Sequence, residues 1–88
     1  MREILTALID DTSRQIKLLA SAIEEQDCQK TARLAHYSKG ACANVGANTA
    51  AALLKHIEHE AGRGQFPECA TSLFALSGEI DRLRTEMQ

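Results

Sequence analysis

The 88-residue chain has few of the residues that β-sheets and membrane spans require. Aromatic residues make up 3% of it, tryptophan is absent, and there is one proline. Because strands favour aromatic and β-branched side chains, this composition indicates aliphatic packing between helices. No apolar run approaches the roughly 20 residues of a membrane helix, and no signal peptide precedes the first predicted helix. We therefore expect no contact with a membrane.

The chain also lacks positive net charge and regularly spaced cysteines. Its formal net charge is −2, whereas non-specific binding of nucleic acid needs a basic surface, so we expect no nucleic-acid partner. The three cysteines, Cys28, Cys42 and Cys69, are odd in number and follow neither metal-binding nor CxxC spacing. We expect them to be reduced thiols of a cytoplasmic protein, packed as small hydrophobic side chains.

Apolar residues recur at steps of three and four in four segments, which predicts four helices. The predicted helices span residues 2–26, about 28–43, 48–61, and a last segment with Pro67 in its first turn. Asp27 is suited to cap the second helix, and Gly46 is suited to end it in a left-handed conformation. Whether residues 10–13 interrupt the first helix stays open, because Thr12 or Ser13 could cap a new one.

Short connections between these helices predict one all-α domain, residues 1–88, folded as an antiparallel up-down four-helix bundle. The apolar seam of the fourth helix is expected to comprise Phe66, Leu73, Leu76, Ile80, Leu83 and Met87. On the third helix, Lys55, Glu58 and His59 are expected to face outward or sideways as solvated charge. One small core of this kind is what a chain of this length can support.

The second helix presents one histidine, His36, among small side chains. Its apolar side is expected to comprise Leu34, Ser38, Ala41 and Val45, and His36 lies roughly opposite Leu34. The surface neighbours of the histidine are Ala32, Lys39, Gly40 and Ala43. Glycine inside a helix costs about 0.5–1 kcal/mol relative to alanine. The missing side chain at Gly40 therefore indicates that a partner, or the imidazole itself, needs the room.

The pattern His36-x-x-Lys39-Gly40, followed by small residues and by Gly46, resembles the core motif of the histidine-containing phosphotransfer (HPt) family. The resemblance covers essentially the whole chain. It implies a four-helix module that carries a phosphoryl group between receiver domains of a phosphorelay, with His36 as the acceptor. In that family the receiver supplies Mg²⁺ and the acidic pocket, so the resemblance implies no cofactor or metal held by the chain itself. Nothing in the sequence binds ATP, so we expect a phosphoryl carrier and no enzyme.

The residue types around His36 suit this chemistry. A neutral imidazole nitrogen is a good nucleophile towards an aspartyl phosphate. Lys39 can bring its ammonium to the negative charge of the product, and Gly40 leaves space for the phosphoryl group or the receiver. A receiver is expected to contact Ala32 and Ala43, which keep the surface flat, and Arg33, which could add a second positive charge. Because such a face suits transient docking, we expect a monomer.

Ser38 departs from the family pattern, which usually has a larger apolar residue there. A serine loses core volume, and we expect its hydroxyl to bond to the carbonyl one turn back. Tyr37 is expected to fill part of the space. On the third helix, His56 and His59 lie three residues apart, which is not the spacing of a helical zinc pair, so no metal site is expected.

Three other interpretations stay open. His36 could be an ordinary exposed histidine without chemistry. The chain could instead be the phosphorylated domain of a larger chemotaxis-type or hybrid sensor kinase, since chemotaxis-type domains share the His-x-x-Lys-Gly pattern. It could also be a bundle that docks a partner without phosphotransfer. The unshaded histidine, the lysine one turn on and the glycine inside the helix together favour phosphotransfer.

Overall fold

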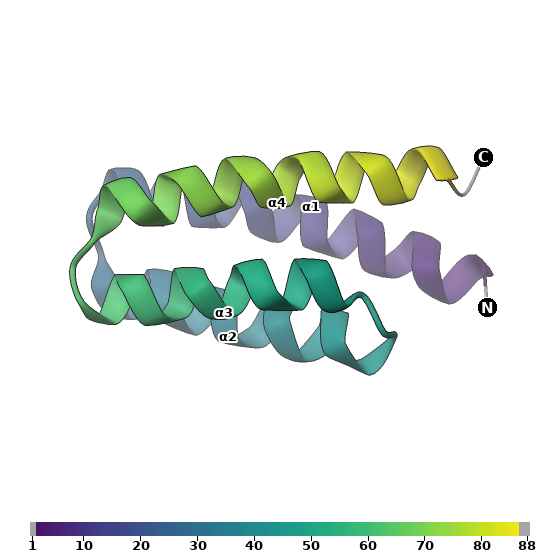
Figure 1. Ribbon diagram of the computed structural model, residues 1–88, viewed down its shortest axis with the longest axis horizontal. Coiled ribbons are helices and arrows are strands. Elements are labelled where there is room, and N and C mark those ends of the chain that lie inside the picture. Colours follow the sequence, from purple (N-terminus) through teal and green to yellow (C-terminus); the bar gives the residue numbers. More distant parts are fainter. Residues whose placement is uncertain (1, 87–88) are drawn as a thin grey trace.

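The computed structural model describes residues 2–86, and the side chains from Thr6 onward. This part of the chain forms four helices: α1 (Arg2–Glu24), α2 (Cys28–Asn44), α3 (Asn48–Gly62) and α4 (Phe66–Glu86). Each helix runs antiparallel to the one before it (Figure 1). Helices α1 and α3 each pack against both α2 and α4, which closes the bundle. The predicted all-α fold is confirmed.

Short capping signals set the helix ends. The Asp27 carboxylate accepts a hydrogen bond of 3.0 Å from the backbone N–H of Lys30, as predicted for an N-cap. Gly46 has a φ of +78°, and the N–H of Ala47 bonds back to the carbonyl of Cys42 at 2.9 Å. This left-handed stop turns the chain within residues 45–47. Helices α2 and α3 therefore form a tight antiparallel hairpin.

Helix α1 is continuous, which answers the question left open at residues 10–13. Thr12 is buried in the bundle, so it faces the core and does not cap a new helix. The helix ends at Glu24, short of the predicted residue 26. Gln26 adopts a left-handed φ of +57°, and the N–H of Asp27 bonds to the carbonyl of Ala22, which stops the helix.

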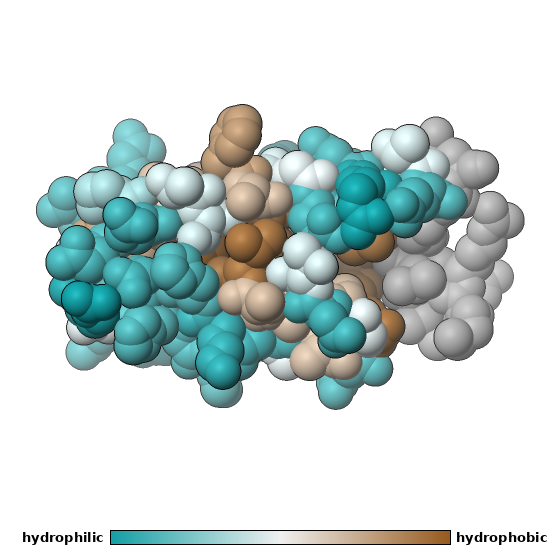
Figure 2. Space-filling view, viewed as in Figure 1, coloured by the Kyte–Doolittle hydropathy of each residue, from teal (hydrophilic) through white to brown (hydrophobic). Residues whose placement is uncertain are grey.

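The core is aliphatic and draws on all four helices. Its buried apolar residues are Ile9, Leu19, Ala22, Ile23, Ala35, Cys42, Ala50, Leu54, Ile57, Ala61, Cys69, Leu76 and Ile80. On the side of the molecule in Figure 2, hydrophobic groups surface mainly in the middle, and hydrophilic groups cover much of the rest. The predicted seam of α4 lies on this core, except that Met87 is outside the described residues.

The prediction for the apolar side of α2 was partly wrong. The helix buries Thr31, Ala35, Ser38 and Cys42, a stripe of small residues. Leu34 and Ala41 lie on the flank of this stripe, and Val45 is 37% exposed. Because α2 packs against both α1 and α3, the face between these two contacts is the one that turns inward. Cys42 and Cys69 are buried as predicted, whereas Cys28, the first residue of α2, is exposed.

The two expectations for Ser38 and Tyr37 were also wrong. Ser38 is fully enclosed, and among the described residues its Oγ has no hydrogen-bond partner. Tyr37 is 58% exposed and fills none of the space beside it. The reason is geometric, because consecutive helix residues point about 100° apart. With Ser38 facing inward, Tyr37 lies about 100° round the helix from it, on the exposed side of α2.

No helix in the described residues is both long and apolar enough to cross a membrane.

Candidate functional site

Three side chains from α2 and α3 meet where these two helices pack side by side. The His36 side chain is 69% exposed, and its Nδ1 lies 3.0 Å from Oε2 of Glu58. Lys39 donates from Nζ to Oε1 of the same carboxylate at 2.8 Å. One glutamate on α3 thus binds both a histidine and a lysine from α2.

The positions of these residues follow from the buried stripes of the two helices. His36 comes directly after the buried Ala35, and Lys39 directly after the buried Ser38. Glu58 comes directly after Ile57, which is buried in α3. Each of the three side chains therefore lies on the flank of its helix, next to the core side.

The negative charge of Glu58 determines which ring nitrogen of His36 carries the proton. The hydrogen bond from Lys39 is the main reason that the pKa of Glu58 lies below its usual range. The positive charge of Lys39 and the hydrogen bond from His36 act in the same direction, and partial burial opposes them. An ionised carboxylate can only accept hydrogen bonds, so Nδ1 of His36 must carry the proton. In the neutral ring, Nε2 then keeps its lone pair on the side away from Glu58.

The surface beside His36 is open, as the sequence indicates. Gly40 is exposed, and a Cβ built on it would meet no atom within 4 Å. Helix packing therefore does not require glycine at this position. Arg33 and Ala43 are also exposed, in keeping with a docking surface. Ala32 is partly buried against the core, so it offers a partner less surface than predicted.

Sequence reasoning missed Glu58, which it placed among the solvated charges of α3. The carboxylate is only 29% exposed and is held between two partners. One signal could have found it. In an antiparallel hairpin, residues at similar distances from the connection lie opposite each other, and His36 and Glu58 are each about three turns from residues 45–47.

No cluster of three or more metal-ligating side chains is present in the described part of the chain. His56 and His59 are both exposed on α3. Nε2 of His59 lies 3.9 Å from the carboxylate of Glu60. The carboxylate that contacts His36 is that of Glu58, which also accepts a hydrogen bond from Lys39.

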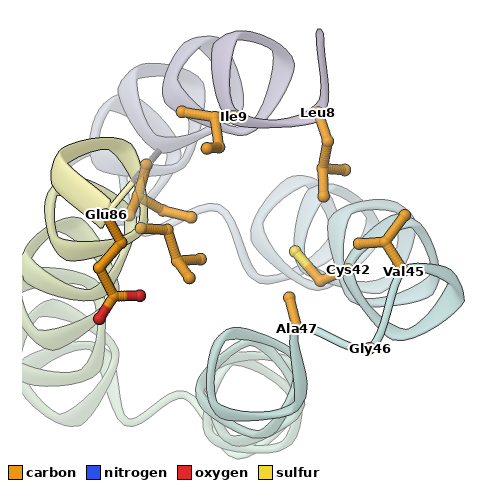
Figure 3. Close-up of a pocket in the computed structure, with 9 residues that line it drawn as sticks. Leu8, Ile9, Cys42, Val45, Gly46, Ala47 and Glu86 are labelled. Carbon is orange, nitrogen blue, oxygen red and sulfur yellow. The ribbon is translucent and has the colours of Figure 1, made fainter. Parts of the chain in front are cut away.

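A separate apolar pocket of about 230 Å³ lies beside the α2–α3 connection, between the outer ends of α1 and α4 (Figure 3). It is lined by Leu8, Ile9, Cys42, Val45, Gly46, Ala47, Ile80, Leu83 and Glu86. Burial raises the pKa of the Cys42 thiol, an effect that a hydrogen bond with Thr12 partly offsets. The thiol is therefore protonated at neutral pH, and the pocket shares no residue with the His36 site.

The sequence matches the family model of the Hpt domain over residues 3–86, nearly the whole chain. The chain belongs to the Hpt domain family. Membership implies phosphotransfer in two-component signalling, in which Hpt domains carry phosphoryl groups and interact with receiver domains. Searches of curated proteins and of solved structures gave no significant match. The resemblance inferred from the His-x-x-Lys-Gly pattern is thus confirmed at the level of the family.

Proposed function

We propose that this Hpt domain accepts a phosphoryl group on Nε2 of His36 from the aspartate of one receiver and passes it to another. The observation that carries this proposal is the contact of His36 with Glu58, which gives an exposed imidazole a defined proton position. An ordinary exposed histidine, solvated by water and without a chemical role, needs no such partner. A bundle that merely docks another protein has no use for it either.

The proposed transfer needs no general base to remove a proton from His36. The lone pair of Nε2 attacks phosphorus, and the N–P bond forms as the bond from phosphorus to the aspartyl oxygen breaks. The aspartate leaves with the electron pair as a carboxylate. Since Nε2 carries no proton, none has to be removed, and Nδ1 keeps its own. The ring gains positive charge, which the carboxylate of Glu58 offsets, and the reverse steps return the group to a receiver.

Lys39 has two tasks in this proposal. Its hydrogen bond to Oε1 of Glu58 fixes the carboxylate against the ring. Its ammonium also places a positive charge beside the reacting histidine, which favours the negatively charged phosphoryl group. Mg²⁺ is supplied by the receiver, and the Hpt domain contributes the nucleophile and the surface on which the receiver docks.

The docking surface is proposed to comprise the open turn at Gly40, with Ala43 and Arg33 beside it. Ala32 takes a smaller part, because it lies partly against the core. A flat surface of this kind suits one receiver at a time on a monomeric Hpt domain. The free cysteines fit a cytoplasmic setting. The same chemistry would operate if the domain were part of a larger kinase.

The test is transfer of radiolabelled phosphate from a receiver charged with acetyl phosphate, using several receivers because docking is selective. The expected product is an acid-labile, base-stable phosphate on the wild-type chain that is absent from His36→Gln. If no receiver charges the chain, isolated kinase ATP-binding domains are tried as donors. Failure with both classes of donor would contradict the proposed function.

A further inference from the structure

One lysine of the hairpin beside His36 has no ion-pair partner among the described residues. Lys55 lies on α3 one turn before Glu58, and its side chain is exposed. Glu58 is its acidic neighbour at i+3 and would ordinarily pair with it. Both oxygens of that carboxylate are already engaged, Oε1 by Lys39 and Oε2 by His36. The ammonium of Lys55 is therefore available for another anion.

The antiparallel hairpin places Lys55 about one helical turn from the level of His36. His36 contacts Glu58, and Lys55 lies three residues from Glu58, towards the α2–α3 connection. Gly40, one turn from His36 in the same direction on α2, is exposed, and the space where a Cβ would stand is open. No side chain at this position therefore shields the ring from the flexible stem of a lysine.

We infer that Lys55 is the cation that binds the phosphoryl oxygens once His36 is phosphorylated, while Lys39 stays on Glu58. The inference rests on the proposed function, because it requires phosphate on His36. It involves charge alone, since no bond or proton changes at Lys55. In the free protein the lysine also adds positive charge beside the site, which attracts the anionic phosphorylated aspartate of a receiver.

The test charges the whole chain chemically with phosphoramidate, so that no receiver is needed. A pH titration followed by ³¹P NMR then measures how readily the phosphoryl group on His36 takes up a proton. A nearby cation weakens that proton affinity. We expect Lys55→Gln to raise the affinity about two- to fivefold, the range of an exposed ion pair. Lys55→Arg should restore the wild-type curve, and Lys17→Gln, an exposed lysine of α1, should leave it unchanged.

Two results would overturn the inference. One is a Lys55→Gln protein that titrates as the wild type does. The other is a shift of this size in Lys39→Gln alone, which would make Lys39 the binding cation. Absence of any chemical modification of His36 would also overturn it, because the inference needs an accessible ring. None of these results depends on receiver transfer, so failure of the proposed function is recognised separately by the receiver assay.

Discussion

Nδ1 of His36 lies 3.0 Å from Oε2 of Glu58, although the two residues are 22 positions apart in the sequence. Through this contact, the packing of α2 against α3 influences the His36 ring. It joins the one exposed histidine of the family motif to a carboxylate that the hairpin brings alongside. The orientation and the proton position of the His36 ring therefore depend on how α2 and α3 pack.

Replacing Glu58 should slow phosphotransfer without unfolding the bundle. In Glu58→Gln the amide can either accept from Nδ1 or donate to it, so the proton position on the ring is no longer fixed. A hydrogen bond to a charged group contributes about 1.5–3 kcal/mol, so we expect transfer at least about tenfold slower. Rapid-quench kinetics with a charged receiver would measure the rate, and Glu68→Gln on α4 is the matched control. An unchanged rate in Glu58→Gln would refute the role of this residue.

The contacts of Glu58 should also make stability depend on pH. Because its pKa is lowered in the folded state, the carboxylate stabilises the fold above its unfolded pKa of about 4.3. This contribution is lost as the pH falls through the lower folded value. Urea unfolding should therefore show the wild type about 0.5–1 kcal/mol more stable than Glu58→Gln at pH 7, with a difference that shrinks as the pH is lowered below the unfolded pKa. A difference that grew as the pH fell would contradict this sign.

Removing the hydroxyl of Ser38 should stabilise the domain. The hydroxyl is buried without a hydrogen-bond partner in the described part of the structure, and such a group costs about 1–3 kcal/mol. We expect Ser38→Ala to raise the free energy of unfolding by about 1 kcal/mol in urea titrations. Transfer through His36 should be unaffected, because Ser38 points into the core. Destabilisation would show instead that the hydroxyl makes a useful bond.

Substitutions at Gly40, the helical glycine beside His36, should affect stability and phosphotransfer differently. Gly40→Ala meets no atom within 4 Å, so it should stabilise the helix by about 0.5–1 kcal/mol. Gly40→Leu should remain folded but lower the rate of receiver transfer severalfold or more, because its side chain occupies the docking surface. Gly78 is the matched control, since it is also an exposed helical glycine with open space around it. Gly78→Leu should leave transfer unchanged, and equal losses in both leucine variants would argue against a special role for Gly40.

The sequence alone predicted the features that short segments determine. Asp27 and Gly46 marked the ends of α2 because capping depends on a few adjacent residues. The pattern from His36 to Gly40 identified the family for a similar reason, since it lies within about one helical turn. These local signals were sufficient for the bundle and for the family.

Features that depend on contact between helices were not accessible in this way. The pairing of Glu58 with His36 requires the register of α3 against α2, which no pattern within one helix encodes and which only the count of turns from their connection could have indicated. The inward stripe of α2 was misjudged for the same reason, because packing on two neighbours selected the small residues Ala35 and Cys42 over Leu34. Tyr37 is exposed for the same reason, because the helix turns a different face inward than predicted.

The most direct test of this account is to find which ring nitrogen of His36 carries the phosphoryl group after transfer from a receiver. The chain would be labelled with ¹⁵N histidine, and ¹H–¹⁵N correlation spectra with ³¹P coupling would identify the bonded nitrogen. The account predicts phosphorus on Nε2, with a proton retained on Nδ1 beside Glu58. Phosphorus on Nδ1, or on another residue with His36 unmodified, would contradict it.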